Sequence, residues 1–138
     1  MTIAKTIFAS GIAFAAVLVT TAAVWADETR DIAFQAKVDG TTQKYVEWLP
    51  PAFEAARTND VLLAFHGHGS DRWQFIKDAR GECRGVRNVA ARFRLILISP
   101  DYRAKTSWMG PKAEADVLQI IAELKQRHKV GRVFLAGG

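Results

Sequence analysis

Three uninterrupted apolar runs constrain the fold of this 138-residue chain more than any other feature. They occupy residues 61–65, 95–98 and 133–136. A strand that is apolar on both faces is typical of a parallel sheet covered by helices on each side, because only there are both faces removed from water. The sequence therefore predicts three parallel strands.

The segments between these runs have the periodicity of helices that pack on a sheet. One apolar stripe consists of Val86, Val89, Ala90 and Phe93. A second consists of Ala113, Val117, Ile120, Ile121 and Leu124, and Pro111 before it suits a first helical turn. The predicted order is therefore strand, helix, strand, helix, strand, which makes two βαβ units of an α/β fold.

A β-hairpin is predicted before these units. Residues 31–38 and 42–49 have strand-like alternation and flank Asp39-Gly40, a pair that suits the positive φ angles of a tight turn. Pro50-Pro51 ends the second strand, because proline cannot donate to a ladder.

The first 26 residues have the pattern of a secretory signal peptide. Lys5 is the only charged residue before Asp27, residues 6–26 are uncharged and mostly apolar, and Val24-Trp25-Ala26 suits a cleavage site. We therefore expect export to the periplasm or the cell exterior, with residues 27–138 as a single partial domain. A retained membrane anchor is the alternative, because the uncharged run is long enough to span a bilayer.

Charge and cysteine content narrow the function classes. Removal of residues 1–26 leaves 18 basic and 14 acidic residues, a net charge of +4. The basic cluster of Arg80, Arg84, Arg87, Arg92 and Arg94 has no aromatic-basic repeat, so a solvated helix face is favoured over nucleic-acid binding. Cys83 is the single cysteine, so it is buried, free, or paired with a residue outside this chain.

Ligands of open α/β sheets bind at the carboxyl ends of the strands. The first predicted parallel strand ends in His66-Gly67-His68-Gly69. Glycines there allow a sharp turn that leaves backbone N–H groups free to bind an anion. His66 and His68 could instead share a zinc ion, but a third ligand is not apparent, so we expect no metal. A glycine turn without function is the remaining interpretation.

The sequence "HGHG", the strand ending in "SPDYR" and the final strand ending in Gly137-Gly138 together resemble the α/β-hydrolase fold. The resemblance covers residues 31–138 and is strongest to exported esterases, including the polyester-depolymerase, feruloyl-esterase and peptidase-like branches. It implies that residues 66–69 form the oxyanion loop, with the His68 N–H as donor. It also implies that Gly137 and Gly138 begin the nucleophile elbow G-x-S-x-G.

The fold implied by the resemblance is the N-terminal half of an α/β-hydrolase sheet, incomplete because the serine, acid and histidine of the triad would follow Gly138. The implied function is an exported serine hydrolase that cleaves small or polymeric carboxylic esters through an acyl-enzyme, without a cofactor and with no membrane contact beyond the export signal. The chain as given is then inactive. A self-contained exported module that binds an anionic ligand is the alternative.

The resemblance also assigns the loop after the second parallel strand to the wall of the substrate pocket. Tyr102, Arg103 and Trp108 are its candidate substrate-binding residues, although Trp108 could simply pack under the loop. Asp116 could hold the loops or favour a helix dipole. The fold further implies that residues 133–136 form an exposed apolar edge strand, so we expect this chain not to form a stable monomer.

Overall fold

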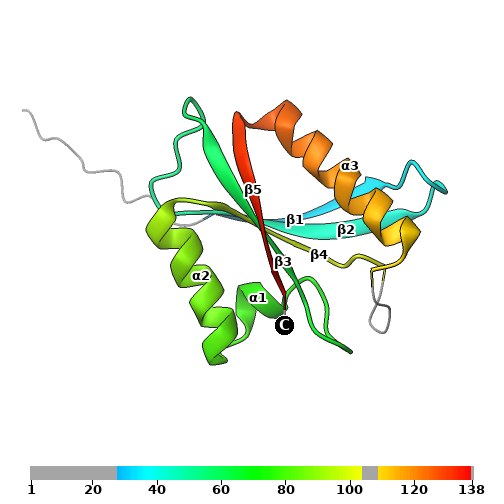
Figure 1. Ribbon diagram of the computed structural model, residues 1–138, viewed down its shortest axis with the longest axis horizontal. Helices are drawn as coiled ribbons and strands as arrows, with labels where there is room; N and C mark the ends of the chain where they lie inside the picture. Colours follow the sequence, from blue (N-terminus) through cyan, green and yellow to red (C-terminus); the bar gives the residue numbers. More distant parts are fainter. Residues whose placement is uncertain (1–27, 104–108, 138) are drawn as a thin grey trace, which may run out of the picture.

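The computed structural model describes residues 28–103 and 109–137 (Figure 1). The elements in chain order are β1 (Glu28–Gln35), β2 (Thr42–Leu49), β3 (Asn59–Phe65), α1 (Gln74–Lys77), α2 (Gly81–Phe93), β4 (Ile96–Pro100), α3 (Pro111–Arg127) and β5 (Val130–Gly137). The predicted hairpin followed by βαβαβ is confirmed. The short helix α1 was not predicted, because one turn is too short to show periodicity.

The five strands form one mixed sheet in the order β1-β2-β4-β3-β5. β3 is parallel to both β4 and β5, whereas β2 is antiparallel to β1 and to β4. β3 therefore lies between its two parallel neighbours, and the predicted α/β fold class is confirmed.

The hairpin turn is longer than the sequence predicted. Strand pairing ends at Gln35 and Thr42 rather than beside Asp39-Gly40. The Ala36 N–H donates to the Thr41 carbonyl at 2.8 Å, and Gly40 alone of the predicted pair has a positive φ, of +70°. A two-residue turn of the predicted kind would need positive φ at both positions, so the tight turn was wrong.

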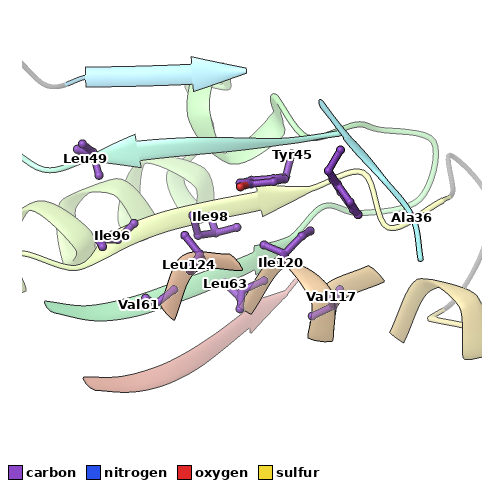
Figure 2. Close-up of a cluster of buried hydrophobic side chains, with 11 residues drawn as sticks. Ala36, Tyr45, Leu49, Val61, Leu63, Ile96, Ile98, Val117, Ile120 and Leu124 are labelled. Atoms are coloured by element: carbon purple, nitrogen blue, oxygen red, sulfur yellow. The ribbon is translucent and has the colours of Figure 1, made fainter. Parts of the chain in front are cut away.

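Both faces of the sheet are covered, as the uninterrupted apolar runs predicted. α3 lies on one face, and α1 and α2 lie on the other (Figure 1). Under α3 the core contains Tyr45, Leu49, Val61, Leu63, Ile96, Ile98, Val117, Ile120 and Leu124 (Figure 2). Under α1 and α2 it contains Trp48, Leu62, Ala64, Phe75, Cys83, Ala90, Leu95 and Leu97. Successive residues of β3 thus alternate between the two cores.

α2 packs through a different stripe from the one predicted. Cys83 and Ala90 are its buried residues, whereas Val89 is 44% and Phe93 is 63% exposed. Arg87 explains this rotation, because its guanidinium donates to two backbone carbonyls of α1 and the turn after it, at 2.7 and 2.8 Å. The predicted stripe was therefore wrong at Val89 and Phe93.

The stripe predicted for α3 is confirmed at Ala113, Val117, Ile120 and Leu124, which are all buried, and Pro111 stands in the first turn. Among residues 28–103 and 109–137, no helix is long and apolar enough to cross a bilayer.

β5 lies at one edge of the sheet, as expected. Phe134 and Leu135 are 41% and 69% exposed, and Val133 and Ala136 are half-buried. The Arg132 guanidinium pairs with the Asp60 carboxylate of β3 at 2.8 Å, so the only charged side chain of this strand is held toward its neighbour.

Candidate active site

The carboxyl ends of β3 and β5 lie side by side. Phe65, the last residue of β3, pairs in register with Gly137 of β5. A Cβ atom added to Gly137 would lie 3.8 Å from the Phe65 carbonyl oxygen, which shows how closely the two backbones approach. The oxyanion-loop residues predicted from the sequence therefore begin beside Gly137. Gly138 lies outside the described residues.

The loop after β3 turns through Gly67 and Gly69. Gly69 has a φ of +75°, a conformation that favours glycine, and the Ser70 N–H donates to the Gly67 carbonyl at 3.2 Å. The Gly67 N–H donates to Oε1 of Gln74 at 2.9 Å. His68 is exposed, and within the described part of the chain its N–H donates no hydrogen bond. Within the described residues, the His68 N–H is therefore left without an acceptor.

The His66 side chain is part of the scaffold of this loop. The residue is only 3% exposed, and its ring nitrogens lie 2.9 Å from the Gly67 carbonyl and 3.3 Å from the Asp101 carbonyl. The Tyr102 hydroxyl donates to the His66 carbonyl, and the two rings lie 4.5 Å apart between centroids. Burial raises the pKa of Tyr102 above its usual value, which keeps this hydroxyl a donor.

His66 and His68 do not form a metal centre in the described geometry. His66 is buried, His68 is exposed, and the described ranges contain no group of three or more His, Cys, Asp or Glu side chains placed to hold a metal ion.

A guanidinium that the sequence reasoning missed fixes the segment after the loop. Arg72 donates to both carboxylate oxygens of Asp31 on β1 at 2.8 Å, and to the Asp101 carboxylate after β4 at 2.9 Å. Its backbone N–H donates to the same Asp101 carboxylate at 2.9 Å. The hydrogen bond from Arg72 lowers the pKa of Asp31, although burial opposes this shift. Arg72 and Asp101 are polar residues that follow parallel strands, and this was a signal available in the sequence. The sequence could not show that Arg72 also pairs with Asp31 on β1.

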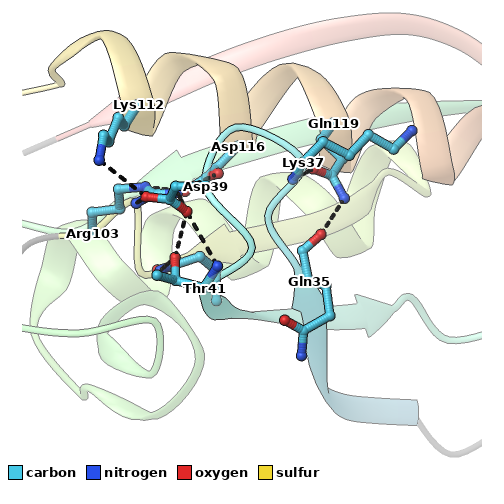
Figure 3. A network of polar contacts seen from close by, with 9 residues as sticks. Gln35, Lys37, Asp39, Thr41, Arg103, Lys112, Asp116 and Gln119 are labelled. Carbon is cyan, nitrogen blue, oxygen red and sulfur yellow. Dashed lines mark hydrogen bonds and ion pairs between the residues drawn. The ribbon is translucent and has the colours of Figure 1, made fainter.

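The turn after β4 has an unusual backbone. Tyr102 and Arg103 have φ angles of 32° and 66°, and the left-handed region costs a non-glycine residue about 1–2 kcal/mol. Side-chain contacts hold this turn in place. Nη1 of Arg103 lies 2.6 Å from the Asp39 carboxylate in the hairpin loop, and its Nε lies 2.6 Å from the Asp116 carboxylate on α3 (Figure 3).

This network includes two residues considered from the sequence. The Arg103 guanidinium pairs with two carboxylates that tie the hairpin loop to α3, and its contact with substrate stays a prediction. The Asp116 side chain is 3% exposed and holds the loop above it, one of the two roles considered from the sequence. Trp108 lies outside the described residues.

A polar cavity of about 390 Å³ opens beside the oxyanion loop. Its lining consists of Gln43, His66, Ser70, Asp71, Arg72, Asp101 and Arg103. Because all of these side chains carry donors or acceptors, the cavity suits a polar group rather than an aliphatic one.

The basic cluster considered from the sequence is partly engaged within the protein. Arg80 pairs with Asp78 at 2.7 Å, and Arg87 donates to backbone carbonyls near α1.

Comparisons with known proteins give structural likeness alone. No protein-family model and no curated protein matches the sequence. A ferulic acid esterase from the anaerobic fungus Anaeromyces mucronatus has a TM-score of 0.62 at 16% identity, over 86% of this chain and 52% of that one. That enzyme has also been solved in complex with ferulic acid.

Two further structures are also similar over most of the chain. S-formylglutathione hydrolase from Staphylococcus aureus has a TM-score of 0.61 at 16% identity, over 81% of this chain and 47% of that one. Another ferulic acid esterase has a TM-score of 0.63 at 17% identity, over 82% and 50%. The chain is therefore structurally similar to α/β-hydrolase esterases over most of its length, and it spans about half the length of those proteins.

Proposed function

We propose that this chain provides the oxyanion-loop half of a serine hydrolase that cleaves carboxylic esters. One observation carries the proposal: the His68 N–H has no partner within the described residues, and the loop that carries it begins beside the end of β5 at Phe65 and Gly137. The structural similarity to esterases supports it.

In the proposed reaction, a serine oxygen attacks the ester carbonyl carbon while a base accepts its proton. The carbonyl oxygen becomes an oxyanion, which accepts a hydrogen bond from the His68 N–H. Collapse of this intermediate breaks the bond to the alcohol, which leaves with a proton, and water then releases the acid from the acyl-enzyme. The serine and the second N–H donor would follow Gly138, in the elbow that Gly137 begins.

For the substrate we propose a carboxylic ester, small or polymeric. The polar cavity between the oxyanion loop and β2 would accept the more polar side of the ester. We also propose that the protein acts after export, which rests on the pattern of residues 1–26. By itself, the 138-residue chain is expected to show no turnover of short p-nitrophenyl esters.

The decisive experiment begins with the DNA downstream of the Gly138 codon. We expect a frame, directly or after a frameshift, that encodes Ser-x-Gly, then an Asp or Glu, and later a His. The protein from that longer frame should hydrolyse p-nitrophenyl esters. His68→Pro should lower its kcat about a hundredfold, because proline has no N–H to donate.

His68→Ala is the matched control, because it removes the imidazole and keeps the backbone donor. The kcat of this variant should stay within a few-fold of the parent value, because the backbone N–H that binds the oxyanion is still present. Equal losses in the two variants would show that the imidazole, rather than the N–H, acts in catalysis. If no downstream frame encodes Ser-x-Gly, the hydrolase proposal fails and the anion-binding module becomes the better account.

A further inference from the structure

The end of the molecule opposite the candidate active site has a distinct surface. The turn after β2 and the end of α2 meet there, away from the carboxyl ends of β3 and β5 (Figure 1). We define the amino-end face as residues 52–60 together with Phe93, Arg94, Lys129 and Arg132. Contacts between these residues show that they form one surface: Phe93 and Arg94 line a hollow with residues 57–60, and the Lys129 ammonium donates to the Ala56 carbonyl at 3.1 Å.

The centre of the amino-end face is apolar. A shallow hollow of about 660 Å³ is lined by Ala52, Phe53, Glu54, Ala55 and Ala56. A smaller and mostly polar hollow of about 160 Å³ adjoins it and is lined in part by Phe93, which is 63% exposed and belongs to neither core. The Arg92 guanidinium lies 5.5 Å from the centroid of the Phe93 ring, and the exposed part of the ring is available to be buried by another surface.

Cationic side chains surround this apolar centre. Arg57, Arg94, Lys129 and Arg132 face Glu54 and Asp60, so the amino-end face has a net charge of +2. The side chains of Arg94 and Arg132 are 58% and 78% exposed despite their ion pairs with Glu54 and Asp60. Exposed pairs of this kind contribute little to stability, and their cations remain accessible to an anionic surface.

The ion-paired residues beside the candidate active site have a different balance of charge. Their networks join Arg72, Arg103 and Lys112 to Asp31, Asp39, Asp101 and Asp116, a net charge of −1. An anionic surface would therefore be attracted to the amino-end face more than to these networks.

The chain enters the described part of the molecule at the same end. Glu28 begins β1 and pairs with Leu49, three residues before Ala52 of the amino-end face. In the sequence, the uncharged run of residues 6–26 comes immediately before this point. A leader that enters a membrane, whether or not it is later removed, would bring this face to the lipid surface.

We propose that the amino-end face docks on an anionic lipid surface, with Phe93 and the alanines at the acyl boundary and the four cations at the lipid phosphates. The candidate active site then faces the aqueous side. A nucleic acid would satisfy the charges but not the apolar centre, so lipid is the better match. The inference does not depend on the proposed hydrolase activity.

Hydrogen exchange of the full chain tests the proposal. The chain is mixed with vesicles of phosphatidylcholine alone, and with vesicles that also contain phosphatidylglycerol. Residues 6–26 are uncharged and should insert into both kinds of vesicle. A difference in exchange between the two kinds of vesicle therefore measures binding of the amino-end face to anionic lipid. Amides of residues 52–58 and 92–94 should exchange at least about fivefold more slowly on the anionic vesicles, the effect of one bound cation or more. Amides of residues 66–70 should not change.

Two variants and two controls sharpen this test. Phe93→Ser and Arg94→Asn should each lower the added protection about fivefold or more, and asparagine tolerates the left-handed backbone of Arg94. Leu118→Ser and Arg84→Gln remove an exposed apolar group and an exposed charge outside the face, and should keep the protection. Far-UV circular dichroism verifies that each variant folds alike.

Several results would overturn the proposal. Equal exchange on the two kinds of vesicle would show that the face does not dock on anionic lipid. Equal loss of protection in the control variants would show that the effect is not localised. The same protection by a short DNA duplex, insensitive to Phe93→Ser, would identify a general polyanion surface instead.

Discussion

Gln74 occupies one of the N–H groups of the loop after β3, the proposed oxyanion loop. It is 9% exposed, and its side-chain oxygen accepts the Gly67 N–H at 2.9 Å. A part-buried N–H without a partner would be costly, so this contact stabilises one orientation of the loop. The His68 N–H, one residue later, remains open on the exposed side.

Gln74→Met tests this role, because methionine has a similar shape and lacks the amide oxygen. The unpartnered Gly67 N–H would favour local opening by about 1–3 kcal/mol. We therefore expect the Gly67 amide to exchange at least about fivefold faster, measured by hydrogen exchange with NMR detection. Gln126→Met, at an exposed position of α3, is the control and should leave the loop unchanged. Unaltered Gly67 exchange in Gln74→Met would contradict the assignment.

Asp39 makes the hairpin loop sensitive to acid. The hydrogen bond from Arg103 holds the pKa of Asp39 far below its usual value, and further hydrogen bonds come from Thr41. A depressed folded-state pKa means that the stabilisation is fully present above the unfolded value, about 3.9. It decreases as pH falls from there toward the folded pKa.

We accordingly expect amides of residues 37–41, corrected for intrinsic exchange, to keep their protection down to about pH 4 and to lose it progressively below. Asp39→Asn should lose most of this protection at every pH, because asparagine cannot carry the charge that Arg103 binds. Glu114→Gln, at an exposed first-turn position, should behave as the parent. Protection in Asp39→Asn equal to that of the parent at pH 7 would disprove a role for the ion pair.

At the scale of elements, the sequence correctly predicted those strands and helices whose apolar residues follow a regular local pattern. Continuous apolar runs identified β3, β4 and β5, and the stripe of α3 was right because a helix that crosses a whole sheet face needs a full-length apolar side. The rotation of α2 was wrong because Arg87 binds backbone carbonyls of a helix that has no sequence signature. The hairpin loop was misjudged because only one residue of Asp39-Gly40 needs a positive φ.

In the candidate site too, local patterns could be predicted from the sequence, whereas contacts between distant residues could not. Glycines after β3 indicated the position of the loop, because their backbone freedom is local. Arg72 and Gln74 were missed because their partners, Asp31, Asp101 and Gly67, are brought near by the sheet order and by α1. Such pairs become visible only when strand order is known.

β5 is the element most exposed to association. The outer edge of this strand presents unpaired backbone groups, which invite pairing with another chain, and the side chain of Leu135 on one of its faces is 69% exposed. Leu135→Lys should reduce aggregation and ANS binding of the 138-residue chain, followed by light scattering and fluorescence. Leu63→Ala, which removes a fully buried side chain, should increase both, because such cavities cost about 2–5 kcal/mol. Unchanged aggregation in Leu135→Lys would show that β5 is not the associating edge.

At the scale of the whole molecule, the described chain begins at Glu28, at the same end as the amino-end face. The predicted signal peptide, residues 1–26, comes just before this point in the sequence. Removal of residues 1–26 remains a prediction from the Val24-Trp25-Ala26 junction. N-terminal sequencing of the exported product should begin at Asp27. A product that still begins at Met1 would establish the retained anchor instead, and would bind membranes of any charge through that segment.

The antiparallel pairing of β2 with β4 affects when this molecule can fold during synthesis. β2 leaves the ribosome early, but its second neighbour follows only after residues 50–95 have been made. Closing so long a loop costs entropy that the hairpin's own contacts do not return. The outer edge of β2 therefore remains unpaired, and the apolar face that includes Tyr45 remains uncovered, through most of translation. For that interval it is a target for chaperones, and the hairpin cannot join the rest of the sheet until β4 emerges.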